Sequence, residues 1–334
     1  MKPIRVYQII IVALLFCNVI GVAILVKYRH QIVDIIDIAY REYNRELRNA
    51  HCERMNELNT LVDNPNDWYC LHKIVAHGGG GIDNKTCTNS YESIQLHYDN
   101  GTRMFDIDMI FTSDSVLVCR HGWNDNLEQT NFTASQTRFF QWDIEQQRYN
   151  LPRSTWKNLD YKSFIETKPH RKYTPISVVD FLNFMETHDD VWLLCDFGHI
   201  ASEKYNYFYK KILSNYSDDV CSRIVVTFNE FSDLTKLRLI NPDIKLQLKR
   251  YGMTTENYYE VAKFCIQNEI HAINLSVYNI DDKCIRLFRQ HGIHVFMAVV
   301  DYLSDYDYCL KQGASGIVSN FLFEDDLKLK RNGF

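Results

Sequence analysis

Acidic residues stand within or near the ends of two apolar, strand-like runs of this sequence. Asp106 and Asp108 stand two residues apart in the run RMFDIDM, so on a strand their carboxylates project from the same face. Asp196 lies at the end of the run VWLLCDF. Carboxylates that share one space repel each other unless a cation lies between them, and oxygen ligands of this kind suit Mg²⁺ or Ca²⁺. The pattern predicts a divalent cation bound by Asp106, Asp108 and Asp196; loop-capping and salt-bridging roles for these residues are the alternative.

Two histidines are expected beside these carboxylates. His77 ends the run KIVAH. After Met109 the sequence IFTSDSVLVCRH is too short for a crossover helix, so we expect a β-hairpin that turns at residues 112–115 and returns His121 to the level of Asp108. Two imidazoles that converge on a carboxylate cluster fit a general acid and a general base. We therefore predict His77 and His121 as catalytic residues.

The elements that carry these side chains alternate between strand and helix. Eight short apolar runs predict strands at residues 73–77, 103–109, 191–197, 223–228, 244–248, 271–277, 293–299 and 316–321. Helical patterns lie between them at residues 90–99, 176–188, 202–214, 232–240, 257–268 and 281–291. This alternation is typical of an α/β fold of the parallel (β/α)₈ barrel type, and a doubly wound open sheet is the alternative. In a barrel the chemistry belongs at the carboxyl ends of the strands, where Thr227, Lys249, Asn274, Asp301 and Asn320 are further candidates.

The composition limits the class of protein. The chain has 334 residues, of which 46% are hydrophobic and 24% charged, so it is able to bury a full-size core. Its 42 acidic and 37 basic residues include no long basic run, which argues against a nucleic-acid partner. The ten cysteines include no CxxC pair, so we expect buried thiols rather than a disulfide scaffold or a structural zinc site.

The N-terminal region differs from the rest of the chain. Residues 9–26 carry no charged side chain and would form about 27 Å of helix, enough to cross a bilayer core. We expect a single-pass membrane anchor rather than a cleaved signal peptide, because basic residues follow where a small-residue cleavage site should be. Basic residues on the two flanks nearly balance and leave the sidedness open, with an extracytoplasmic catalytic domain as our working assumption.

Three regions follow from these patterns. We expect the anchor within residues 1–30, a helical stalk or linker at residues 31–66, and a barrel domain at residues 67–330. The stalk pattern also fits a first helix packed on the barrel. Residues 124–175 form an aromatic-rich insert in the barrel domain. It is interpreted as a lid or substrate-recognition segment, or equally as a packed decoration.

The segment AHGGGGIDNKTCTNSYESIQLHYDNGTRMFDIDMIFTSDSVLVCRHGW, residues 76–123, resembles the catalytic core of the glycerophosphodiester phosphodiesterase family. That family belongs to the phospholipase C-like phosphodiesterase barrels. Its His-Arg-Gly strand end, Glu-Asn-Thr, Glu-x-Asp strand and returning histidine correspond here to His77, Thr88-Asn89-Ser90, Asp106-x-Asp108 and His121. Later, WLLCDFG resembles the family's Glu-x-Lys strand, and FMAVVD with GIVSNF resembles its C-terminal motif pair. The resemblance covers roughly residues 73–323 and implies a metal-dependent hydrolase of small-molecule phosphodiesters.

Three positions depart from the family pattern. Gly78 replaces the arginine after the first histidine, Thr88 replaces a glutamate, and Gly198 replaces the lysine of Glu-x-Lys. Glu92, one helical turn after Thr88, is a candidate fourth metal ligand and equally an ordinary helix residue.

Arg120 and Lys249 are candidates for the positive charge that would bind the phosphate. The absence of three residues of the family pattern leaves two alternatives to hydrolysis open. One is a catalytically weakened barrel that binds a phosphorylated lipid or glycan fragment, and the other is a lyase-type cyclising phosphodiesterase.

Overall fold

The computed structural model describes residues 58–123, 158–198, 201–251, 257–277 and 282–331, together with Ala39, Glu46 and Arg54. The predicted membrane span at residues 9–26 lies outside these residues, and so do two thirds of the residues of the predicted stalk. Among the described helices, none is long and apolar enough to span a bilayer. The chain divides into two compact units, residues 1–58 with 254–263 and residues 59–253 with 264–334. The second unit holds the barrel.

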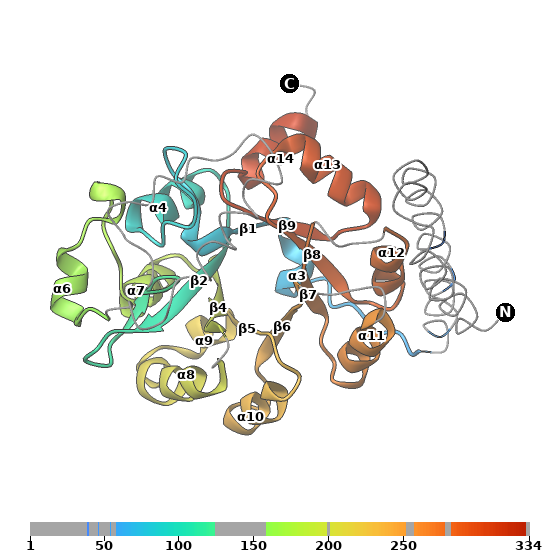
Figure 1. Ribbon diagram of the computed structural model, residues 1–334, viewed down its shortest axis with the longest axis horizontal. Coiled ribbons are helices and arrows are strands. Elements are labelled where there is room, and N and C mark those ends of the chain that lie inside the picture. Colours follow the sequence, from blue (N-terminus) through green and yellow to red (C-terminus); the bar gives the residue numbers. More distant parts are fainter. Residues whose placement is uncertain are drawn as a thin grey trace, which may run out of the picture. The chain divides into compact units, whose positions relative to one another are not determined.

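Eight parallel strands form a closed barrel. They are β1 (Ile74–Ala76), β2 (Met104–Phe111), β4 (Trp192–Asp196), β5 (Ile224–Phe228), β6 (Lys245–Lys249), β7 (Ala272–Ser276), β8 (His294–Ala298) and β9 (Gly316–Ser319). The strands pair in the order β1-β9-β8-β7-β6-β5-β4-β2, and β1 also pairs with β2. This last pairing closes the ring, which is visible in the arrangement of the strands in Figure 1. The predicted (β/α)₈ barrel is confirmed, and the open-sheet alternative is wrong.

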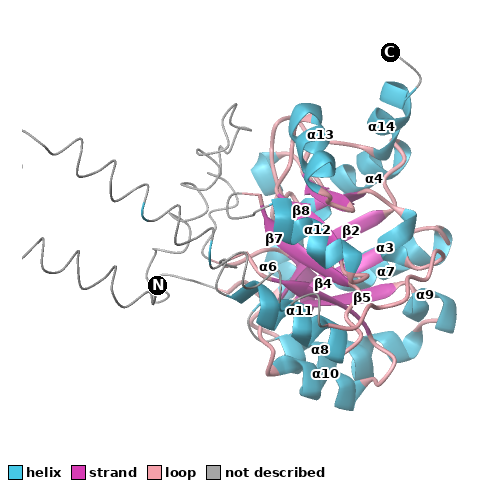
Figure 2. Ribbon diagram, turned by 90° about the vertical axis from the view of Figure 1, so that its right-hand side faces the viewer, coloured by secondary structure: helices cyan, strands magenta, loops and turns pink. Residues whose placement is uncertain are grey.

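Helices surround the strands, as Figure 2 shows from the side. The principal helices are α4 (Tyr91–Asp99), α7 (Val178–Thr187), α8 (Ala201–Tyr207), α9 (Asp218–Ser222), α10 (Asp233–Ile240), α11 (Tyr258–Gln267), α12 (Asp282–Gln290), α13 (Leu303–Gln312) and α14 (Glu324–Arg331). Short turns are η1 (His77–Gly79), η3 (Pro169–Arg171), the π-helical η5 (Phe208–Ile212) and η6 (Leu213–Asn215). The predicted helices thus occur between the predicted strands.

Local sequence signals fix where these helices begin. Ser90 caps α4 by accepting a hydrogen bond from the Ser93 backbone N–H. Ser177 and Asp180 form a reciprocal capping box at the start of α7. Such caps satisfy backbone donors that a helix leaves unpaired, typically contributing about 1 kcal/mol each.

The barrel interior is apolar near the amino ends of its strands and polar near their carboxyl ends. A buried apolar cluster contains Val75, Met104, Leu194, Val225, Ala272, Phe296 and Val318. Below it, the short helix α3 (Trp68–Leu71) closes the barrel floor with Trp68 and Tyr69, and the Trp68 ring stacks on Phe296 at 5.6 Å. Because side chains alternate along a strand, the next inward positions after the apolar layer are polar on most strands, with Ala298 of β8 an exception, and they lead to the barrel mouth.

The predicted hairpin is confirmed. Strand β3 (Leu117–Cys119) runs antiparallel to β2, with Met109 opposite Cys119, and the chain turns where the Ser115 N–H donates to the Thr112 carbonyl. The described end of the insert contains α6 (Tyr161–Glu166), and Phe164 packs with Val118 and Trp123 of the hairpin segment. Residues 158–166 therefore decorate the hairpin, whereas residues 124–157 lie outside the described part of the chain.

Among the described cysteines with placed side chains, none forms a disulfide bond. They are Cys70, Cys87, Cys119, Cys195, Cys221, Cys265 and Cys309, and four of them are buried.

Candidate active site

The loop after β1 holds its shape through glycines. Gly78 has φ +53° and Gly80 has φ +93°. A Cβ at position 80 would lie 2.3 Å from His97, and one at position 78 would lie 2.8 Å from the Cα of Cys87. The arginine of the family pattern is therefore excluded at position 78 in this conformation, because any side chain there would meet the Cys87 backbone.

His77 is oriented by a chain of hydrogen bonds from β9. The Asn320 side chain donates from Nδ2 to Asp301 Oδ2 at 3.0 Å, and its Oδ1 accepts from the Cys87 backbone N–H at 3.1 Å. The same Oδ1 lies 3.2 Å from His77 Nδ1. Since an amide oxygen only accepts, His77 carries its proton on Nδ1, which leaves Nε2 as the basic atom.

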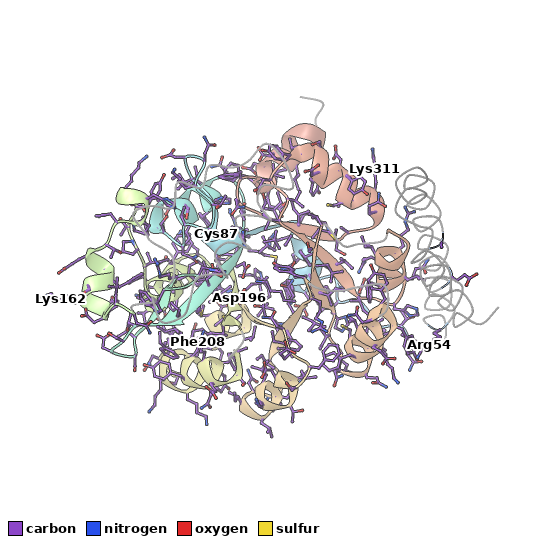
Figure 3. All side chains as sticks on the ribbon, in the orientation of Figure 1. Arg54, Cys87, Lys162, Asp196, Phe208 and Lys311 are labelled. Atoms are coloured by element: carbon purple, nitrogen blue, oxygen red, sulfur yellow. The ribbon has the colours of Figure 1, made fainter. Side chains whose placement is uncertain are left out.

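The Cys87 sulfur lies beside the same imidazole. It is 3.0 Å from His77 Nδ1 and 3.4 Å from Nε2. Cys87 and Asp196 are both labelled in Figure 3, over the central part of the barrel in that view. A thiol therefore borders the histidine, a feature that the sequence analysis did not anticipate.

The predicted aspartates gather at the carboxyl ends of β2 and β4. Asp106 and Asp108 share one face of β2, and the register places Asp108 directly opposite Asp196 of β4. Asn89 Nδ2 donates to Asp108 Oδ2 at 2.9 Å, while Asn89 Oδ1 accepts from the Asp108 backbone N–H at 3.3 Å. Asn89 therefore fixes the direction in which the Asp108 carboxylate points.

Lys249 completes this cluster. Its ammonium group pairs with Asp196 Oδ2, and Asp196 Oδ1 accepts from the Gly198 N–H at 2.8 Å. Burial alone would raise the pKa of Asp196, but the charge and hydrogen bond of Lys249 prevail and lower it to about 2. Burial would lower the pKa of Lys249, yet the charges of Asp196, Tyr251 and Asp106 raise it well above its usual range. The pair is therefore ionised at neutral pH.

Asp106 lies deeper in the barrel than Asp196, and burial dominates its pKa. It is 4% exposed, and its Oδ1 has no hydrogen-bond partner among the described residues. Burial raises its pKa well above the usual range; the Lys249 charge opposes this, and the charges of Asp196 and Asp108 add to it. A cation beside Asp106 would reverse this effect by stabilising the carboxylate.

The aspartate cluster suits a hard divalent cation in charge and donor type. Lys249 offsets one of three carboxylate charges, and the unpaired Asp106 oxygen is available to a ligand. The three carboxylates are more widely spaced than a preformed cluster, in which all ligand atoms lie within 4.8 Å of one another. Asp106, Asp108 and Asp196 would hold such a cation, which would supply positive charge beside that of Lys249.

The hairpin delivers the two other predicted residues. The Arg120 N–H donates to the Asp108 carbonyl at 2.9 Å, so His121 follows at the level of the aspartates, and its charge contributes to lowering the Asp196 pKa. His121 is exposed. Arg120 is buried, donates from Nε to the Gly122 carbonyl at 2.5 Å, and lies 5.3 Å from the Trp123 ring centre. The structure thus brings His77, His121, the three aspartates and Lys249 to the barrel mouth, whereas the Arg120 side chain contacts Gly122 and Trp123.

Glu92, a metal-ligand candidate or equally an ordinary helix residue in the sequence analysis, bonds to Thr174. Its two carboxylate oxygens accept hydrogen bonds from the Thr174 backbone N–H and hydroxyl, each at 2.8 Å. Among the described contacts, none joins Glu92 to the aspartates.

Lys204 is a site residue that sequence reasoning missed. Its Nζ donates to the Phe197 carbonyl at 2.7 Å, and burial lowers its pKa against the opposing charges of Asp196 and Asp108. It lies on α8 rather than at a strand end, so strand periodicity gave no signal for it.

Comparisons with known proteins identify the family and the fold. Residues 77–323 match the sequence model of the glycerophosphoryl diester phosphodiesterase family. No curated protein matches the chain. Among solved structures, a protein described as a glycerophosphodiester phosphodiesterase from Galdieria sulphuraria has a TM-score of 0.60 at 15% identity, covering 78% of this chain and 98% of that one.

Two further structures share the fold. An Oleispira antarctica phosphodiesterase, solved in complex with the product sn-glycerol-3-phosphate, has a TM-score of 0.57 at 11% identity, with coverage of 78% and 97%. A glycerophosphodiester phosphodiesterase from Thermotoga maritima has a TM-score of 0.52 at 14% identity, with coverage of 77% and 97%.

Proposed function

Because the chain belongs to the glycerophosphoryl diester phosphodiesterase family, whose members are phosphoric diester hydrolases, we propose that it hydrolyses glycerophosphodiesters or related lipid-derived headgroup esters. The observation that carries this proposal is the convergence of His77 and His121 on the aspartate cluster and Lys249. These residues come from β1, β2, β4, β6 and the hairpin, and they meet at the end of the barrel where catalysis is expected.

His77 fits the role of general base. Its Nδ1–H is held by Asn320, so Nε2 is the nitrogen that would take a proton from the attacking water. The water oxygen then forms a bond to phosphorus, and the bond from phosphorus to the ester oxygen breaks. His121, in its protonated form, donates a proton to the departing alkoxide. The products are an alcohol and a phosphate monoester.

The aspartates fit the role of cation ligands. Asp106, Asp108 and Asp196 would hold Mg²⁺ or Ca²⁺, which supplies positive charge to the phosphate as negative charge develops. Lys249 would bind a phosphate oxygen, in place of the lysine that the family pattern has at position 198. Glu92 would have to give up its hydrogen bonds to Thr174 to become a fourth ligand, so the proposal rests on the three aspartates.

A binding function is the second candidate, and one observation favours it. Lys249 pairs with Asp196, one of the proposed cation ligands, while Gly78, Thr88 and Gly198 stand where the family pattern has an arginine, a glutamate and a lysine. A barrel weakened in this way would still bind a phosphorylated lipid or glycan fragment. Turnover separates hydrolysis from binding, and a cyclic phosphate product would identify the lyase-type reaction instead.

The test uses the full chain in detergent, a panel of glycerophosphodiesters, and detection of the phosphate monoester. His77→Ala and His121→Ala should each lower kcat at least 100-fold, since a general acid or base contributes about 10²- to 10⁴-fold. The double variant should lose less than the product of the two single losses, because the residues act as one unit. The matched control is His188→Ala, which removes an imidazole that packs on Phe184 away from the mouth. Near-normal turnover in either single variant would reject the paired mechanism.

We also propose that residues 9–26 anchor the enzyme in a membrane, so that it meets lipid-derived substrates at the bilayer surface. Full-length protein should sediment with membranes and resist extraction by carbonate and high salt. Recovery in the soluble fraction without detergent would contradict the anchor.

A further inference from the structure

A second cluster of metal-binding side chains lies at the opposite end of the barrel. Asp63, Cys70 and His294 each offer one ligand atom, and these atoms all lie within 4.8 Å of one another. Asp63 precedes α3, Cys70 belongs to α3, and His294 is the first residue of β8. Since a five-residue strand spans about 16 Å, the cluster is well separated from the aspartates at the mouth.

The contacts converge on one atom. His294 Nε2 lies 3.0 Å from Asp63 Oδ1 and 3.7 Å from the Cys70 sulfur. A neutral imidazole nitrogen either donates one hydrogen bond or accepts one. A proton on Nε2 is donated to Asp63, and Nε2 then cannot accept a hydrogen bond from the Cys70 thiol. A cation between the three atoms would satisfy all of them at once.

The spacing agrees with tetrahedral zinc that has three protein ligands and a water in the fourth position. Bond lengths of about 2.3 Å to sulfur and about 2.0 Å to nitrogen or oxygen place neighbouring ligand atoms roughly 3.3 to 3.6 Å apart. The distances from His294 Nε2 to Asp63 Oδ1, 3.0 Å, and to the Cys70 sulfur, 3.7 Å, bracket this range. The donor set also selects the metal, because a thiolate with an imidazole favours zinc over Mg²⁺ or Ca²⁺.

The surroundings hold the ligands in place. The His294 side chain is 4% exposed, and its ring packs on Tyr69 with 4.6 Å between the ring centres. Asp63 Oδ2, the oxygen that does not face the histidine, lies 3.6 Å from the Arg289 guanidinium. Such outer contacts orient the ligands of metal sites and are part of their affinity.

We propose that Asp63, Cys70 and His294 bind a zinc ion that fastens the segment before β1 to the floor of the barrel. The site is independent of the proposed catalytic reaction. The bound metal would stabilise the folded chain by mass action, because the three ligands converge only when α3 is docked below β8.

The experiment measures zinc binding by the full chain, after removal of bound metal, in an Asp108→Asn background that weakens the mouth site. We expect one zinc per chain, a rise in Tm on zinc addition, and protection of Cys70 from alkylation. Cobalt in place of zinc should give a thiolate-to-metal charge-transfer absorption.

Two variants and a matched control make the test specific. Asp63→Asn, at an exposed position, and Cys70→Ser should each weaken zinc binding at least tenfold and abolish the Tm rise, whereas Cys221→Ser should leave both unchanged. Cys221 is a half-buried thiol that contacts the Leu213 carbonyl elsewhere in the fold. If Asp63→Asn and Cys70→Ser bind zinc within twofold of the parent chain, or if the parent binds none, the proposal is overturned.

Discussion

Lys249, at the end of β6, pairs with Asp196, at the end of β4, across the intervening strand β5. The position at which the family pattern has a lysine is Gly198, with φ +64° and open space around a notional Cβ. Lys249 therefore supplies positive charge at the barrel mouth from β6, which is two strands away from β4, the strand that Gly198 follows.

Lys249→Met should lower kcat/KM at least 100-fold, because it removes a cation from the phosphate and leaves Asp196 buried without its partner. The measurement is steady-state turnover of a glycerophosphodiester, with circular dichroism as a check on folding. Lys245→Met is the matched control, since Lys245 lies on the same strand and face near the barrel floor, where it pairs with Asp67 at 3.4 Å. Equal losses in both variants would show that the effect is structural.

Metal removal should abolish activity. Excess chelator should lower turnover at least 100-fold, and Mg²⁺ or Ca²⁺ should restore it in the parent chain but not in Asp108→Asn, because the amide removes a ligand charge. Asp190→Asn, which alters a surface carboxylate paired with Arg103, is the control. Full activity in excess EDTA would refute a cation at this cluster and leave Lys249 as the electrophile.

Asn320 is predicted to act through His77 as a positioning residue. Asn320→Leu should lower kcat about tenfold, roughly 1.4 kcal/mol in the barrier, while KM changes by less than twofold. It should also shift the pH profile of kcat, because His77 loses the acceptor that fixes its tautomer. Asn183→Leu, at an exposed position on α7, should change neither quantity. A parallel change in kcat and KM with an unaltered pH profile would point to a general structural defect.

The stability of the fold should fall between about pH 6.5 and pH 4. Burial lowers the pKa of His97 to about 4, even though its Nε2 lies 3.0 Å from the Asn320 carbonyl. The unfolded chain therefore binds a proton at higher pH than the folded chain, so stability is lost as the pH falls through this window. For this histidine alone the loss from pH 7.5 to pH 5 is about 2 kcal/mol.

His97→Gln is the variant that tests this dependence, since its amide keeps a donor for the carbonyl but does not titrate. Urea unfolding at pH 7.5 and pH 5 should show a smaller difference in the free energy of unfolding than in the parent chain. An unchanged difference would mean that His97 is not responsible.

Much of the barrel could be predicted because its signals are local. Strand runs such as RIVVTF and IHVFMAV are short and β-branched, and the alternation of side chains placed Asp106 and Asp108 on one face. The length of the segment after Met109 allowed only a hairpin, which fixed the level of His121.

The rest depends on contacts between distant parts of the chain. The link from Asp301 through Asn320 to His77 exists only because β9 pairs with β1 when the barrel closes. Glu92 faces Thr174, a residue of the insert, and no periodicity in the helix of Glu92 reveals that partner. Likewise, Cys70 and His294 are 224 residues apart, beyond the reach of any spacing rule for metal ligands.

The residues at the floor of the barrel determine how far the chain can be shortened at its N-terminal side and still fold. The family match begins at residue 77, whereas Trp68 and Tyr69 lie before it and are 2% and 4% exposed. A fragment that begins at residue 77 would lack Trp68 and Tyr69 and would expose Phe296 to solvent. Since removal of a buried aromatic side chain typically costs about 3–5 kcal/mol, this loss is comparable with the whole stability of an ordinary domain. The homologous segment is therefore shorter than the unit that folds, and expression of the catalytic domain requires the residues that precede it.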